Sequence, residues 1–229
     1  MYFQFLTEDA STGALVDKLM EGLQKEHPDL EYKCKAFKGI GGYDKNKKPK
    51  DAKTGKILND LTIYLNGYNK QLQGIEASII VVVDNDDRDT DEFQTLLESI
   101  VTDNNLSVDH VFCIAIEEME AWLLGDETAV LKAYPAAKKN IIHSYEQDSI
   151  CGTWEILAEA VYPGGLNQLK KDCPTYYEIG ENKIAWAANI GQYMTLQDNQ
   201  SPSFQHFAKN LLQRIESGER QSNDESKKT

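Results

Sequence analysis

Short apolar runs alternate with amphipathic segments over the first half of the chain. Residues 79–83 and 111–116 are apolar throughout and residues 2–6 are apolar except for Gln4, whereas residues 32–37 alternate lysines with apolar side chains. A continuous apolar run of this length, bounded by polar residues, is typical of a strand that is buried on both faces of a parallel sheet. The alternating run is more typical of a strand near the sheet edge.

The segments between these runs carry leucines and other apolar residues at helical spacing. The first such face contains Leu15, Leu19 and Leu23, and similar faces occur over residues 58–72 and 93–101. Ser11 and Thr12 are candidate N-caps for the first helix. The resulting order β-α-β-α-β-α-β predicts an α/β fold with an open, mostly parallel, Rossmann-like sheet and helices on both faces.

The pattern changes after residue 116. Residues 117–217 show almost entirely helical periodicity, interrupted by prolines, with one short strand expected near residues 176–179. Residues 218–229 contain no apolar side chain and are expected to form a disordered tail. We therefore expect an α/β core at residues 1–116 and a C-terminal helical extension or cap at residues 117–217 that completes the site.

Charge is distributed unevenly along the 229 residues. The formal net charge is −13, but residues 33–56 contain nine lysines and only two acidic residues, so this segment carries +7 and the rest −20. The segment is either a solvated surface loop or a flexible arm that grips a polyanion. On the second interpretation the nucleic-acid-binding candidates are Lys45, Lys47, Lys48, Lys50 and Lys53.

Several classes of protein are excluded by the composition. No apolar stretch approaches the roughly 20 residues of a membrane span, and no secretory signal is recognisable at the N-terminus. The four cysteines are scattered without metal-ligand spacing, which favours a reduced, cytoplasmic protein. The histidines form no ligand pair and no phosphate-binding loop is present, so neither a zinc hydrolase nor ATP hydrolysis by this chain is expected.

Acidic residues follow three of the predicted strands. Glu8 follows the first strand, Asp84 and Asp86 follow the central one, and Glu117 and Glu120 follow the fourth. Ligands of open α/β sheets bind outside the carboxyl ends of the strands, so these carboxylates are expected at one edge. Crowded carboxylates favour a hard cation such as Mg²⁺ or Mn²⁺, and two ions could support phosphodiester cleavage. Each cluster alone could instead be a helix cap.

These residues resemble the topoisomerase–primase (TOPRIM) domain, in which a Glu after the first strand and an Asp-x-Asp after a later strand bind Mg²⁺. Glu8 and the Asp84-Asn85-Asp86 run match those motifs. More closely, the chain resembles a TOPRIM-like bacterial family of unassigned function, often encoded beside an AAA-type ATPase and suspected in anti-phage defence. Residues 116–126 carry that family's Glu-x-Glu-Ala-Trp-Leu-Leu-x-Asp signature, and Lys183 fits its C-terminal pattern.

The resemblance implies a Mg²⁺-dependent nuclease acting on DNA or RNA beside an ATPase partner. It assigns metal binding to Glu8, Asp84, Asp86 and Glu120, with Glu117 as an alternative ligand. It also makes Glu8 a candidate general base, and Lys183 either a catalytic residue that steadies a phosphate or an exposed helix-start lysine. Two alternatives remain: a non-enzymatic acidic module that regulates an ATPase partner, and a glycosyltransferase that holds Mn²⁺ and a nucleotide-sugar through Asp-x-Asp.

Overall fold

A four-stranded parallel sheet forms the centre of the computed structural model, which describes residues 1–41 and 55–226. The strands are β1 (Tyr2–Thr7), β2 (Glu31–Ala36), β3 (Ala77–Asp84) and β4 (Asp109–Ala115), in the order β2-β1-β3-β4. All eight residues of β3 are buried, as its continuous apolar run predicts, while every second residue of the edge strand β2 is exposed. The Rossmann-like α/β fold expected from the sequence is confirmed.

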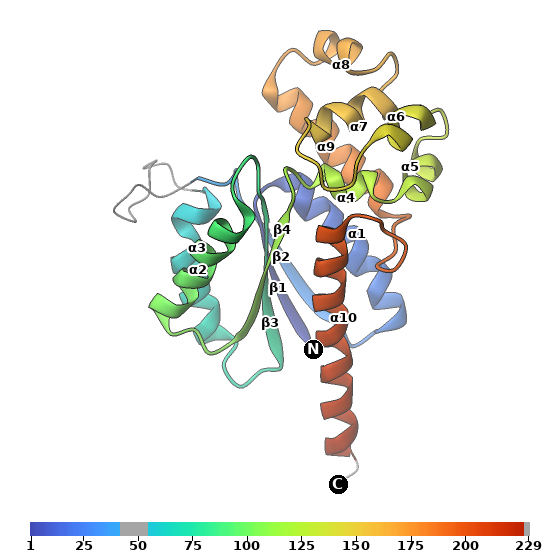
Figure 1. Cartoon of the computed structure of the whole chain (residues 1–229). Helices are drawn as coiled ribbons and strands as arrows, with labels where there is room; N and C mark the ends of the chain where they lie inside the picture. Colours follow the sequence, from blue (N-terminus) through green and yellow to red (C-terminus); the bar gives the residue numbers. More distant parts are fainter. Residues whose placement is uncertain (42–54, 227–229) are drawn as a thin grey trace.

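Helices cover both faces of this sheet and the carboxyl ends of its strands (Figure 1). One face is covered by α2 (Ile57–Gln71) and α3 (Thr90–Asn104), and the other by α1 (Ala10–Glu26) and α10 (Pro202–Ser226). The remaining helices lie beyond the strand ends: α4 (Glu120–Leu124), α5 (Glu127–Ala133), α6 (Lys139–Ser144), α7 (Thr153–Val161), α8 (Leu166–Asp172) and α9 (Tyr176–Gly191). Among the described residues, no helix is long and apolar enough to cross a lipid bilayer.

The helical half of the chain shares a hydrophobic core with the sheet. Phe3 and Phe5 of β1 belong to the same buried cluster as side chains of α4, α7, α9 and α10. Within it, the fully buried ring of Trp122 lies 5.1 Å from the ring of Phe207 and 5.5 Å from that of Phe204, centre to centre. Residues 117–217 are therefore helical, as expected, but they pack onto the α/β core without a separate core of their own.

Three local expectations are corrected by the structure. Residues 176–179, expected as a short strand, form the first turn of α9, because Thr175 and Glu178 make a reciprocal capping box. The N-cap of α1 is Asp9, whose carboxylate accepts the backbone N–H of Thr12. Lastly, α10 continues through Ser226, so a helix crosses most of the segment that was expected to be disordered.

Candidate functional site: a carboxylate cleft at the strand ends

The two central strands bring Glu8 and Asp84 together. Glu8 directly follows β1 and Asp84 is the last residue of β3, and these strands are neighbours in the sheet. The backbone N–H of Glu8 donates to the carbonyl of Val82 at 3.0 Å, and Oε2 of Glu8 accepts the backbone N–H of Asp84 at 3.0 Å. The chain leaves β1 towards β2 and leaves β3 towards β4, so the pair lies at the switch point where open α/β sheets bind ligands.

Both carboxylates are held in an environment that disfavours their charge. Glu8 and Asp84 are each 8% exposed. Burial, and then the neighbouring charge of Glu8, raises the pKa of Asp84, while burial raises the pKa of Glu8 to about 7 against the hydrogen bond from Asp84. Oδ1 of Asp84 is buried and has no hydrogen-bond partner among the described residues. Both carboxyl groups would therefore hold their negative charge more readily if a cation were bound beside them.

A second carboxylate pair reaches the same place from the segment after β4. Glu120, the first residue of α4, is completely buried, and its Oε2 lies 3.2 Å from Nζ of Lys183 on α9. Glu118 Oε1 lies 3.5 Å from the same ammonium. Burial raises the pKa of Glu120, and it raises that of Glu118 to about 7, although Lys183 opposes both shifts. Lys183 is in turn held charged: burial disfavours its ammonium, but the carboxylates of Glu120 and Glu118 raise its pKa.

Lys183 is thus an interior lysine in the middle of α9, with a side chain that is only 14% exposed, and it is not an exposed helix-start residue. It links the acidic segment after β4 to the helical layer. Its neighbourhood also includes Asp84 and Asp9, whose charges raise its pKa further. The structure therefore brings Glu8, Asp84, Glu120 and Lys183 close together.

Asp86 and Glu117 are placed differently. Asp86 has a left-handed backbone (φ 50°) and its Oδ2 pairs with Arg88 Nη1 at 2.6 Å, at the rim of the cleft. The carboxylate of Glu117 instead accepts the backbone N–H groups of Cys151, Gly152 and Thr153 at the start of α7. Although burial opposes the shift, hydrogen bonds led by that from the Thr153 hydroxyl lower the pKa of Glu117.

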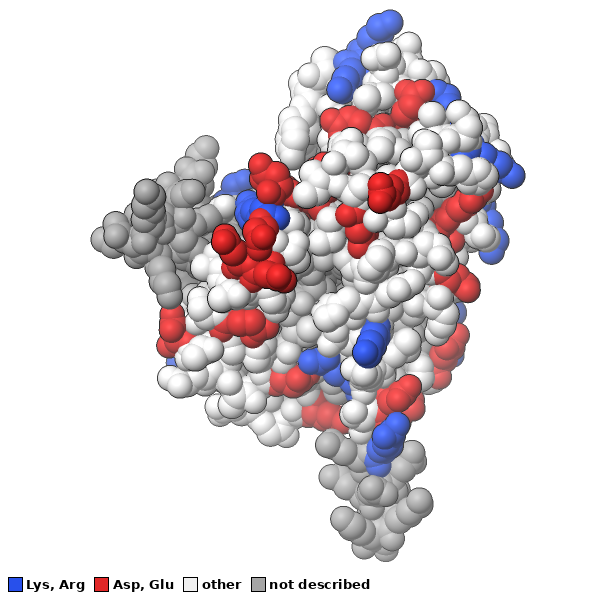
Figure 2. Space-filling view, viewed as in Figure 1, with Lys and Arg blue, Asp and Glu red and all other residues white. Residues whose placement is uncertain are grey.

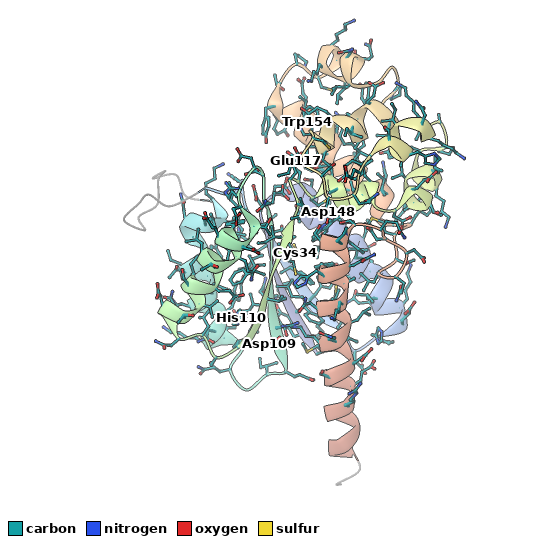
Figure 3. All side chains as sticks on the ribbon, in the orientation of Figure 1. Cys34, Asp109, His110, Glu117, Asp148 and Trp154 are labelled. Carbon is teal, nitrogen blue, oxygen red and sulfur yellow. The ribbon has the colours of Figure 1, made fainter. Side chains whose placement is uncertain are left out.

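Glu117 therefore anchors the helical layer above β4, where Figure 3 shows it below Trp154. Of the acidic segment, Glu118 lines the cleft, and Glu120 is buried beneath it against Lys183, whereas the spacing predicted that Glu117 and Glu120 would act together. The reason is local geometry. Glu117 has φ 56°, and α4 begins only at Glu120, so residues 117 and 120 do not share a helix face.

These side chains line a cleft of about 520 Å³ between the sheet edge and α9. In Figure 2 acidic and basic side chains gather beside the hollow below the helical layer. The charged residues that line the cleft are Glu8, Asp9, Asp84, Asp86, Glu118, Glu181, Lys38, Lys56 and Lys183. With six carboxylates against three lysines, the cleft is acidic, and a cation is the natural ligand of its floor.

The donor chemistry of this floor fits a hard divalent cation. Carboxylate oxygens are the ligands that Mg²⁺ and Mn²⁺ prefer. Oδ1 of Asp84 and Oε1 of Glu120 are buried without a hydrogen bond among the described residues, and Oε2 of Glu120 is in contact with the Lys183 ammonium. As the side chains stand, no three His, Cys, Asp or Glu residues in the described part of the chain are placed so that they could hold a metal ion. Binding therefore requires side-chain rotation, including displacement of the Lys183 ammonium from Glu120.

Sequence reasoning did not identify the residues of α9 other than Lys183 that line the cleft, among them Tyr176, Tyr177 and Glu181, and it did not assign Glu118, Lys38 or Lys56 to the site. Only Glu118 had a direct signal, since it is the first Glu of the Glu-x-Glu signature. The predicted nucleic-acid-binding residues Lys45, Lys47, Lys48, Lys50 and Lys53 lie outside the described residues. Lys38 and Lys56, which belong to the same basic segment, are described and form one wall of the cleft.

Comparison with known proteins places the chain in a family without assigning an activity. Residues 10–212 match the model of a family described as a domain of unknown function, DUF4276. The match covers most of the chain and includes Asp84, Glu120 and Lys183. No curated protein and no solved structure matches the chain.

Proposed function

We propose that this chain, which belongs to the DUF4276 family, is a Mg²⁺- or Mn²⁺-dependent nuclease whose active site is the carboxylate cleft. One observation carries the proposal: buried carboxylates from three separate segments converge at the switch point of the sheet, where Oδ1 of Asp84 accepts no hydrogen bond among the described residues and Glu120 is paired with a lysine. Leaving ionised groups buried and unsatisfied is costly, and such arrangements concentrate at functional sites. The TOPRIM resemblance of the same residues supports this reading.

Glu8, Asp84 and Glu120 would hold the ion, with Asp86 at the rim. A bound divalent cation would supply positive charge to the transferring phosphate and to an attacking water. Glu8 is oriented by the N–H of Asp84 on its Oε2, which leaves Oε1 to take the proton from that water. Without the ion, Lys183 pairs with the carboxylates of Glu118 and Glu120. Once those carboxylates bind the ion, the Lys183 ammonium would be free to contact the phosphate.

Calorimetric titration with Mg²⁺ and with Mn²⁺ tests the metal site directly. The unmodified protein should bind at least one ion, and Asp84→Asn should weaken binding about tenfold or more, because it removes one of the ligand charges. Asp29→Asn is the matched control, because Asp29 is exposed and does not line the cleft, and this variant should bind the ion as the unmodified protein does.

Cleavage of labelled single-stranded and duplex DNA and RNA tests the activity. Cleavage should require the divalent ion, stop in excess EDTA and be lost in Glu8→Gln and Asp84→Asn variants that retain the native circular dichroism spectrum. Cleavage that survives EDTA, or unmodified protein that binds neither ion, would overturn the proposal.

One observation favours a second candidate, a non-catalytic acidic module that regulates an ATPase partner. Lys183 already places an ammonium against Glu120 and Glu118, so the cleft contains a cation of its own. On this alternative neither ion binds, and Asp84→Asn leaves the biological effect unchanged. The ATPase partner itself stays a prediction from the resemblance.

A further inference from the structure

Two tyrosines stand exposed at the mouth of the carboxylate cleft. Tyr176 is 90% exposed and Tyr177 is 74% exposed, and both line the cleft. They occupy the first turn of α9, between Thr175 and Glu178, the two residues whose capping box fixes the start of the helix. Large aromatic side chains usually gain stability by burial, and here neither does so.

The surface next to these rings is open. A Cβ added at Gly180, one turn further along α9, would meet no atom within 4 Å, and Ile184 on the following turn is 37% exposed. Glu181, four residues along the helix, raises the pKa of Tyr177. This side of α9 therefore offers flat aromatic and apolar surface beside a strongly polar floor.

The opposite wall supplies positive charge. Lys38 and Lys56 line the cleft there, and the wall is tied to the sheet edge because the N–H of Gly39 donates to the carbonyl of Glu8 at 2.9 Å. Two lysines can contact phosphate oxygens, but they cannot outweigh the six carboxylates that line the same cleft. A polyanion held by charge alone would be repelled, so its binding needs a contribution that does not depend on charge.

We infer that the nuclease substrate is single-stranded nucleic acid, whose unpaired bases stack on Tyr176 and Tyr177 while its backbone passes between these rings and the Lys38–Lys56 wall. Stacking on aromatic rings is insensitive to sequence and requires exposed base faces, which a duplex hides. The inference rests on the proposed nuclease function for what the site does, but its binding surface can be measured independently.

Fluorescence anisotropy with labelled twelve-nucleotide oligo-dT and oligo-U, at low salt and in EDTA, separates binding from cleavage. The unmodified protein should bind both single strands more tightly than a duplex of equal length. Replacing both tyrosines with alanine (Tyr176→Ala, Tyr177→Ala) should weaken single-strand binding at least about fivefold, since stacking contributes roughly that factor or more per base. Replacing both with phenylalanine should preserve binding, because the ring faces remain.

Tyr193→Ala is the matched control, because this tyrosine is 41% exposed but does not line the cleft, and its affinity should equal that of the unmodified protein. Equal affinity of the double alanine variant and the unmodified protein, or duplex binding as tight as single-strand binding, would overturn the inference. Tyrosine-dependent binding together with a failure to bind Mg²⁺ or Mn²⁺ would support this surface and overturn the nuclease proposal alone.

Discussion

Lys183→Met tests whether the cleft is held together by a buried charge pair. The ammonium of Lys183 lies 3.2 Å from a carboxylate that is completely buried, that of Glu120. At an effective dielectric constant of about 20, this pair attracts by about 5 kcal/mol before the cost of desolvating the lysine is subtracted. Removing one partner of such a pair leaves the other charge buried and typically costs about 3–5 kcal/mol.

We therefore expect Lys183→Met to lower the free energy of unfolding by about 3 kcal/mol in metal-free buffer at pH 8. Methionine keeps the apolar stem, so the loss reports mainly on the charge. Urea unfolding followed by tryptophan fluorescence measures it. Lys18→Met is the matched control: Lys18 pairs with Glu21 at 2.7 Å on the surface, with side chains 33% and 52% exposed. Such a pair contributes little, so the change should stay within about 0.5 kcal/mol.

A double variant separates the charge from the packing. If the loss comes from the orphaned carboxylate, Lys183→Met combined with Glu120→Gln should recover most of it, because neither buried charge then remains. A Lys183→Met protein as stable as the unmodified one, or a double variant no more stable than Lys183→Met, would refute the reasoning.

Three further experiments test other parts of the molecule. Glu117→Gln should lower the free energy of unfolding by about 1 kcal/mol, since a neutral amide weakens the three partly solvated hydrogen bonds from the backbone at the start of α7. An unchanged urea unfolding curve would contradict this anchoring role of Glu117. Iodoacetamide should label exposed Cys151 in the native protein but Cys113 only after unfolding, because burial raises the pKa of Cys113 to about 12. Peptide mass spectrometry that finds Cys113 labelled in the native protein would contradict its buried position in β4. Gly125→Ala should lower the free energy of unfolding by about 2 kcal/mol, because its Cβ would lie 2.1 Å from the amide oxygen of a buried asparagine. Gly67→Ala, in the middle of α2 with open space, should instead raise the free energy of unfolding by about 0.5–1 kcal/mol. Thermal unfolding that shifts both variants in the same direction would refute this contrast.

The sheet was predictable because a strand buried on both faces consists mostly of apolar side chains, which form a recognisable continuous run. The run that became β3 shows this best, since all eight of its residues are buried. Residues 176–179 were harder, because two tyrosines and an isoleucine favour a strand locally. The deciding signal was the Thr175-x-x-Glu178 spacing of a capping box, which outweighs side-chain propensity once both hydrogen bonds form.

The site was predictable only to the level of which segments contribute to it. Glu8 and Asp84 follow neighbouring strands, so the rule for open sheets places them together. Which glutamate after β4 enters the cleft depends on the left-handed backbone of Glu117, a conformation that is uncommon for a residue with a side chain. The contact of Lys183 with Glu120 depends on how α9 packs against α1, and no local pattern encodes that packing.

The packing of α9 also sets the order in which the cleft can be completed as the chain is synthesised. All four strands end by Ala115, so the sheet and its pair of strand-end carboxylates are synthesised before the helical layer. The buried carboxylate of Glu120 meets its ammonium only after residue 183 has been made and α9 has docked. A chain that ends before α9 lacks both Lys183 and the two tyrosines of the cleft. The complete cleft therefore requires the chain through α9, although the strand-end carboxylates of Glu8 and Asp84 lie within the first 84 residues.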